Sequence, residues 1–190
     1  MLECAKVIRM NKNDFSQGSI LKHMINLALP TTLAQVVNVL YNMVDRIYLG
    51  RLDQGSDVLA GVGICFPILM LISAFASFSS SGAVPLFSIA RGEKNKEEAF
   101  ALLGNAFSML MVFGFVIAST SYIFRRPFMA IFGAGPDVLR YGDAYLSIYL
   151  LGTLFVMVST GMNGFINALG NGKVAMYSVL IGAIINIVLD

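Results

Sequence analysis

Five long apolar segments make up most of the chain, and short polar stretches separate them. They run approximately over residues 25–49, 58–89, 99–124, 138–169 and 174–190. A helix that crosses a bilayer needs about 20 residues, which the first four segments exceed and the fifth approaches before the chain ends. The lengths favour helices over strands, and the alternating pattern of about ten residues that is typical of membrane β-barrels does not appear. The pattern predicts an all-α polytopic membrane protein in which residues 1–24 form a leader and residues 25–190 a transmembrane region.

The distribution of Lys and Arg between the two ends of these segments predicts the orientation. Eight basic residues fall on the side of the leader and five on the opposite side; in chain order the first set is Lys6, Arg9, Lys12, Lys22, Arg91, Lys94, Lys96 and Lys173, and the second is Arg46, Arg51, Arg125, Arg126 and Arg140. Cytoplasmic loops carry the excess of Lys and Arg. We therefore expect a multi-pass protein of the plasma membrane with a cytoplasmic amino terminus.

A stripe of polar residues runs along the first apolar segment. Thr31, Gln35, Asn38, Asn42 and Asp45 follow one another at intervals of four, three, four and three residues. At about 100° per residue, these side chains fall within an arc of about 80° on one helical face. Carboxylates and carboxamides are unfavourable against lipid, so this face must contact protein or water. We expect the stripe to line a cavity; the alternative is that its carboxamides only hydrogen-bond neighbouring helices.

Two carboxylates lie inside apolar segments, Asp45 in the first and Asp190 in the fifth. At 1.5 Å per residue they lie about 30 Å and about 24 Å from the starts of their helices, hence at similar depth, with Asn186 one turn before Asp190. Two carboxyl groups in a low-dielectric cavity disfavour ionisation, so one can hold a proton near neutral pH and release it when the cavity hydrates. The alternative for Asp45 is a helix-end charge paired with Arg46 or Arg51.

Composition excludes several other classes of protein. The chain is 57% hydrophobic and 13% charged, with a net charge of +2, which is too small to indicate a nucleic-acid partner. Its two cysteines, Cys4 and Cys65, have no metal-ligand spacing. We see no nucleophile, base and orienting group in a pattern typical of an enzyme, and we expect neither catalysis nor a cofactor.

Short motifs in a fixed order resemble those of the multidrug and toxic compound extrusion (MATE) transporters. The first segment contains LP at residues 29–30 and YNMVDRIYLG at 41–50, which look like the family's first helix. Its second helix and first cytoplasmic loop resemble LAGVG at 59–63, Pro67 and IARG at 89–92. The loop before the fifth helix and the functional motif within that helix resemble ALGNG at 168–172 and NIVLD at 186–190. One departure is SSSGAVP at 79–85, where the family more often alternates Gly with small residues.

This resemblance implies a MATE-like helical bundle. The family's proteins have twelve helices in two lobes and alternate access across a central cleft, so this chain would supply about five helices of the amino-terminal lobe. The family's coupling residues carry over to Asp45, Asn186 and Asp190, which would hold H⁺ or Na⁺. We therefore expect a cation-coupled antiporter that exports cationic amphiphilic drugs, with no cofactor beyond the coupling ion.

Two other functions stay open from the sequence. A flippase for lipid-linked oligosaccharide, from the same superfamily, would need a cationic lumen for pyrophosphate, and the apolar segments contain no central Arg. An inactive truncated fragment is the other alternative, because the chain ends at Asp190 inside its fifth helix. We expect a longer parent protein that adds the missing carboxy-terminal lobe, with the lipid bilayer and small molecules as its other partners.

Overall fold

In a computed structural model, the structure describes residues 19–52 and 54–189, apart from the side chains of Ile20, Lys22, Asn186 and Leu189. These residues form five helices and no strand: α2 (Ile20–Gly50), α3 (Gly55–Gly92), α4 (Lys96–Ile131), α5 (Pro136–Ala168) and α6 (Gly172–Leu189). Four helices in this part of the chain are long and apolar enough to cross a membrane, and α6 is a shorter apolar helix. The prediction of an all-helical, multi-pass protein is confirmed, while leader residues 1–18 and Asp190 lie outside the described residues.

Helix α4 differs most from its predicted bounds. The segment was expected to end near residue 124, with Arg125 and Arg126 in a polar loop, but the helix continues through Pro127 to Ile131. A proline inside a helix removes one backbone donor without ending it when packing holds the chain on both sides. The two arginines tolerate this position because a carboxylate on α5 binds both of them. In the same way α3 runs unbroken through Pro67 and Pro85.

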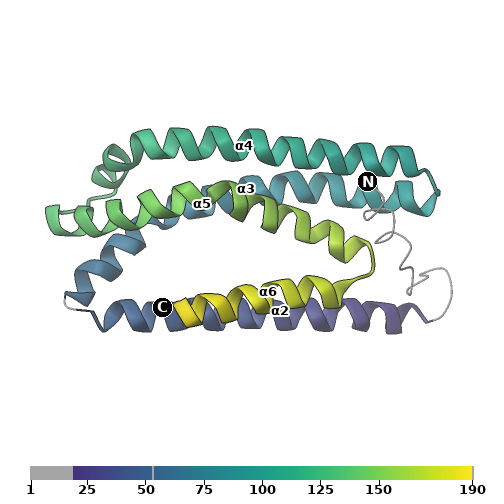
Figure 1. The fold of residues 1–190 in the computed structure, drawn as a ribbon, viewed down its shortest axis with the longest axis horizontal. Coiled ribbons are helices and arrows are strands. Elements are labelled where there is room, and N and C mark those ends of the chain that lie inside the picture. The colour runs from purple at the N-terminus through teal and green to yellow at the C-terminus, as the bar shows by residue number, and fades with distance from the viewer. Residues whose placement is uncertain (1–18, 53, 190) are drawn as a thin grey trace.

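The helices form two groups, which Figure 1 shows one above the other. Helices α3, α4 and α5 pack extensively against one another, and α2 packs along α6. Contacts between the groups are fewer, and they join α2 to α3 and α5 to α6. The groups converge where α3 begins beside the end of α2 and where α5 leads into α6 (Figure 1). This arrangement makes the sides of α2, α5 and α6 that face one another the place to look for a site.

Helices α3 and α5 cross at two glycines that let their backbones touch. A Cβ atom added to Gly61 would lie 2.8 Å from the backbone nitrogen of Gly142, a distance that real side chains do not adopt. The thiol of Cys65, which is fully buried here, lies 3.2 Å from the carbonyl oxygen of Gly61 and 3.5 Å from that of Gly142. Small residues of this kind allow close helix packing in membranes, where no hydrophobic force drives helices together. The crossing brings α3 and α5 into direct backbone contact.

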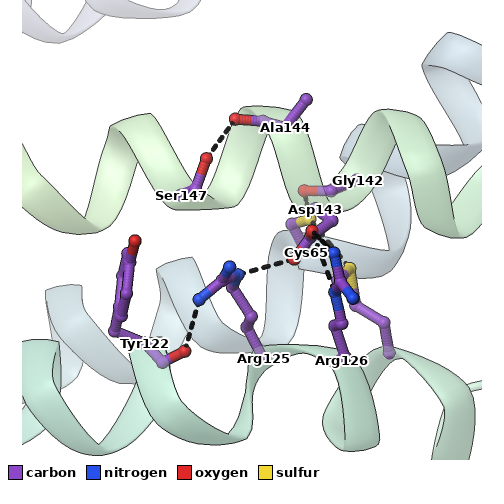
Figure 2. A network of polar contacts seen from close by, with 9 residues as sticks. Cys65, Tyr122, Arg125, Arg126, Gly142, Asp143, Ala144 and Ser147 are labelled. Atoms are coloured by element: carbon purple, nitrogen blue, oxygen red, sulfur yellow. Dashed lines mark hydrogen bonds and ion pairs between the residues drawn. The ribbon is translucent and has the colours of Figure 1, made fainter.

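An ion-pair network joins α4 to α5 near the turn between them (Figure 2). Arg125 donates to Oδ1 of Asp143, and Arg126 donates to Oδ2 from Nε and Nη2 at 3.0 and 2.9 Å. Arg125 also donates from Nη1 to the carbonyl oxygen of Tyr122 at 2.8 Å and lies over the ring of that residue. Asp143 keeps only 15% of its side chain exposed, so both oxygens are committed to the arginines.

Replacing Asp143 tests how much this network stabilises the fold. Asp143→Asn keeps the shape but removes the charge and one acceptor, so we expect the free energy of unfolding to fall by about 1–2 kcal/mol. Thermal unfolding of the purified protein in detergent measures this. Asp137→Asn, at an exposed first-turn carboxylate of the same helix, is the matched control and should cost less than about 1 kcal/mol. Equal losses in the two variants would contradict a specific role for the network.

Candidate functional site

A cleft of about 690 Å³ lies between α2, α5 and α6, with one residue of α3 at its edge. Its size falls in the range of pockets that hold drug-sized molecules. Polar lining residues come from all four helices: Thr31, Gln35, Asn38 and Tyr41 of α2, Ser80 of α3, Ser159, Thr160, Asn163 and Asn167 of α5, and Ser178 of α6. Apolar lining includes Phe155 and Met176. None of the described residues that line the cleft carries a charge, so its walls offer dipoles, aromatic faces and a thioether.

The α2 wall consists of the first part of the predicted stripe. The structure places Thr31, Gln35 and Asn38 on the cleft. The Thr31 hydroxyl lies 2.9 Å from the carbonyl oxygens of both Leu27 and Ala28, so it hydrogen-bonds back onto its own helix. Pro30 stands one residue earlier and is buried. This wall therefore presents the carboxamides of Gln35 and Asn38 to the cleft, while the Thr31 hydroxyl is hydrogen-bonded to the backbone of its own helix.

The remaining two residues of the stripe lie further along α2 and do not line the cleft. Asn42 differs from its predicted role: its side-chain amide donates to the backbone oxygen of Asn38 at 2.7 Å and to the Oδ1 atom of Asn38 at 2.8 Å. It therefore orients the lining residue Asn38. Asp45 is half-buried and lies within electrostatic range of the Tyr145 phenol on α5. The predicted stripe thus contributes three residues to the cleft, one that contacts Asn38 and one within electrostatic range of Tyr145.

Arg46 was one of the two arginines that could pair with Asp45 if Asp45 were only a charge at the end of the helix. Its guanidinium lies 5.7 Å from the centre of the Phe66 ring on α3. This cation–π contact gives the arginine a partner on the neighbouring helix. On α5, Tyr145, which lies within electrostatic range of Asp45, stacks on Tyr149 with ring centres 6.0 Å apart.

The α5 wall was missed by the sequence reasoning. Asn167 donates to Oδ1 of Asn163 at 3.2 Å, and Asn163 donates to the Ser178 hydroxyl of α6 at 3.4 Å. A signal for this wall existed, because Ser159, Asn163 and Asn167 recur every four residues in an apolar segment, just as the stripe of α2 does. The longer fourth segment, with its several small and polar residues, obscured that spacing.

The residues predicted on the fifth helix are only partly placed. Asn186 lies in α6, one turn after the lining residue Gly182 and two turns after Ser178, but its side chain is not described. Asp190 lies outside the described residues, so its shared depth with Asp45 stays a prediction. In the part of the chain that the structure describes, no group of three His, Cys, Asp or Glu residues could hold a metal ion.

Comparison with known proteins decides the family. The sequence model of the MatE family matches residues 30–190, which is most of the chain and includes every residue that lines the cleft. The chain belongs to the MatE family. Members of this family are membrane transporters, and the prediction made from the short motifs is confirmed.

Relatives of the chain are named for multidrug export or multidrug resistance. The chain is similar to the multidrug export protein MepA of Staphylococcus haemolyticus, with 27% identity over 93% of this chain and 39% of that protein. It is also similar to the probable multidrug resistance protein YoeA of Bacillus subtilis, with 26% identity over 92% of this chain and 37% of that protein. The chain thus spans less than two fifths of the length of these relatives.

Solved structures of MATE proteins share the fold. A MATE protein in the straight conformation superposes with a TM-score of 0.84 at 25% identity, covering 97% of this chain and 39% of that one. An outward-facing multidrug resistance transporter of the MATE family gives a TM-score of 0.83 at 25% identity, with the same coverage. The MATE-like helical bundle predicted from the sequence is therefore confirmed.

Thiol labelling tests whether the cleft is an aqueous space or a packing contact. A cysteine at Ser159, on the cleft wall, should react with a charged, water-soluble reagent, because the thiolate that reacts forms only in contact with water. A cysteine at Ile148, which is 74% exposed on another part of α5, should stay unreactive in lipid. Buried Cys65 serves as an internal blank once Cys4 is replaced by Ser. Equal protection of the Ser159 and Ile148 positions would show that the cleft is closed to water.

Proposed function

We propose that this chain forms part of a longer antiporter that exports cationic amphiphilic compounds in exchange for H⁺ or Na⁺. The observation that carries the proposal is the uncharged polar cleft between α2, α5 and α6. One of its walls, α2, also carries the carboxylate of Asp45. One relative named as a multidrug export protein and another named as a probable multidrug resistance protein support export of small molecules. The amino terminus would lie in the cytoplasm and the protein in the plasma membrane.

The lining suits a cationic amphiphile better than an anion. Tyr41 and Phe155 offer aromatic faces to a cation and to flat apolar groups, and Met176 adds an adaptable thioether. The carboxamides of Gln35, Asn38 and Asn163 offer both donors and acceptors. A pyrophosphate group would need Arg or Lys, and the described lining residues include neither. This lining disfavours the flippase alternative.

Competition between the coupling cation (H⁺ or Na⁺) and the cationic compound would couple the transport of one to the transport of the other. A proton or Na⁺ neutralises the carboxylate cluster that we assign to Asp45, Asn186 and Asp190, and Na⁺ prefers such carboxylate and carboxamide oxygens. A cationic compound in the cleft favours the charged carboxylates instead. Each ligand shifts the conformational equilibrium by its difference in affinity for the two states, and this competition is sufficient for antiport. The protein needs no cofactor for this mechanism.

Neutralising Asp45 tests the coupling. In the full-length protein that contains this chain, Asp45→Asn should abolish drug efflux, because the amide keeps the shape of the carboxylate but exchanges no proton. Membrane expression should stay near normal, since a charge at a helix centre carries an insertion cost of up to roughly 3 kcal/mol, which the substitution removes. Asp190→Asn should behave similarly, and the double variant should be little worse than either single one, because residues that act as one unit are not additive.

Drug-dependent movement of protons or Na⁺ in proteoliposomes measures this effect. Asp57→Asn is the matched control, because this carboxylate stands in the first turn of α3, away from the cleft lining, and should leave transport unchanged. Wild-type transport with an unchanged pH profile in Asp45→Asn would mean that the carboxylate is only structural.

A further inference from the structure

Asn38 and Asn42 form a hydrogen-bonded pair one turn apart on α2. The side-chain nitrogen of Asn42 lies 2.7 Å from the backbone oxygen of Asn38 and 2.8 Å from the Oδ1 atom of the same residue. An amide nitrogen carries two N–H groups, so it can donate to both oxygens at once. Asn38 lines the cleft, whereas Asn42 stands outside the lining. The pair therefore connects a residue of the cleft wall to one behind it.

The backbone oxygen of Asn38 decides the orientation of both amides. A backbone carbonyl only accepts hydrogen bonds, so the atom of Asn42 that lies 2.7 Å from it is the amide nitrogen. That nitrogen in turn requires an oxygen from the Asn38 side chain, because two amide nitrogens form no hydrogen bond with each other. Neither amide can be turned over without placing two like atoms in contact. The amide nitrogen of Asn38 consequently lies on the side that is turned away from Asn42.

This orientation changes what Asn38 offers to a bound molecule. A free carboxamide provides donors and acceptors alike and can rotate to suit its partner. In Asn38 the oxygen is already bound by Asn42, and the groups that remain for the cleft are chiefly the two N–H groups. Asn38 therefore presents the positive end of its amide dipole, which attracts an acceptor and disfavours a cationic group at this point of the wall.

Other polar residues of the cleft are committed in different ways. Asn163 of α5 accepts from Asn167 at 3.2 Å and donates to Ser178 at 3.4 Å, so both ends of its amide are engaged. Turning these amides over would leave both ends engaged, because the Ser178 hydroxyl can also donate. Thr31, two turns before Asn38, donates its hydroxyl proton to backbone oxygens of its own helix at 2.9 Å. Asn38 thus differs from these residues in holding its donors in a fixed direction.

We propose that Asn38 is a specificity residue that donates a hydrogen bond to an acceptor on the transported compound, and that Asn42 is the positioning residue that holds Asn38 in this orientation. The inference rests on the proposed transport function and narrows its substrate class. The compounds favoured are cations that also carry a carbonyl or another acceptor oxygen. The aromatic faces of Tyr41 and Phe155 suit the cationic ring, and Asn38 binds the acceptor. Asn42 needs no contact with the compound.

Two cationic probes that differ in one group test the inference. The first is a fluorescent N-methylquinolinium ion with an acetyl group on its ring, and in the second an isopropenyl group replaces the acetyl group. The two probes have the same charge and nearly the same shape, but only the acetyl oxygen accepts a hydrogen bond. Binding of each probe to the full-length protein in nanodiscs gives two dissociation constants. Their ratio in the wild-type protein, which we call the acetyl preference, is the reference for every variant.

Substitutions of the pair should change the acetyl preference in a defined order. Asn38→Leu removes the donor, so the preference should fall by about fivefold, which corresponds to one hydrogen bond. Asn42→Leu leaves Asn38 in place but frees its amide to turn, so the preference should fall by about twofold if the two orientations are equally populated. The double variant should match Asn38→Leu alone, because Asn42 acts only through Asn38. Asn105→Leu removes an exposed carboxamide of α4 outside the cleft lining, and this matched control should leave the preference unchanged.

The outcomes separate this inference from the proposed function. An acetyl preference that is unchanged in Asn38→Leu overturns the inference, even if the protein binds and exports both probes. An unchanged preference in Asn42→Leu overturns the positioning role of Asn42. The expected losses support the inference even if neither probe is exported, in which case only the transport proposal fails. If the wild-type protein binds neither probe, both proposals are wrong. If Asn38→Leu does not insert into the membrane, Asn38→Ala decides in its place.

Discussion

A carboxamide is unfavourable in the hydrocarbon of a membrane, and this constraint governs how the helices of the chain are arranged. Gln35 and Asn38 on α2 face Asn163 and Asn167 on α5 across a common cleft. Because polar groups within a bilayer must contact protein or water, the outer sides of these helices are left to apolar residues such as Val39 and Ile148. The polar sides of α2 and α5 thereby share one cleft, which α6 also borders.

The contacts within the group of α3, α4 and α5 differ in kind from the contacts between the two groups of helices. Within the three-helix group, Gly61 and Gly142 bring two backbones into contact, and Asp143 binds two arginines of α4. Between the groups the helices meet over few residues, and the hydrogen bond from Asn163 of α5 to Ser178 of α6 is long, at 3.4 Å. A structure with strong contacts inside each group and weak ones between them is suited to movement of one group against the other.

The sequence predicted the helical class and the family. The spacing of polar residues in α2 is visible in the sequence against an otherwise apolar background, and the structure places Thr31, Gln35 and Asn38 on the cleft. The sequence analysis did not predict features that depend on tertiary contacts or on the direction of single side chains. Helix α4 continues past Arg125, and Arg125 binds Asp143, 18 residues later, a contact that no local pattern reveals. Asn42 belongs to the stripe by spacing, but its amide turns back to Asn38. The polar residues of the α5 wall recur every four residues and were detectable in the sequence. Their place in the cleft becomes clear only when α5 is seen opposite the α2 wall.

The central claim is that binding of the coupling cation at Asp45 and binding of a cationic compound in the cleft oppose each other. Equilibrium binding of a fluorescent cationic dye to the full-length protein in nanodiscs, measured across pH and Na⁺ concentration, tests it most directly. The account predicts that the apparent affinity for the dye falls as H⁺ or Na⁺ rises, while the number of dye molecules bound at saturation stays the same. An affinity that is independent of both cations would contradict it.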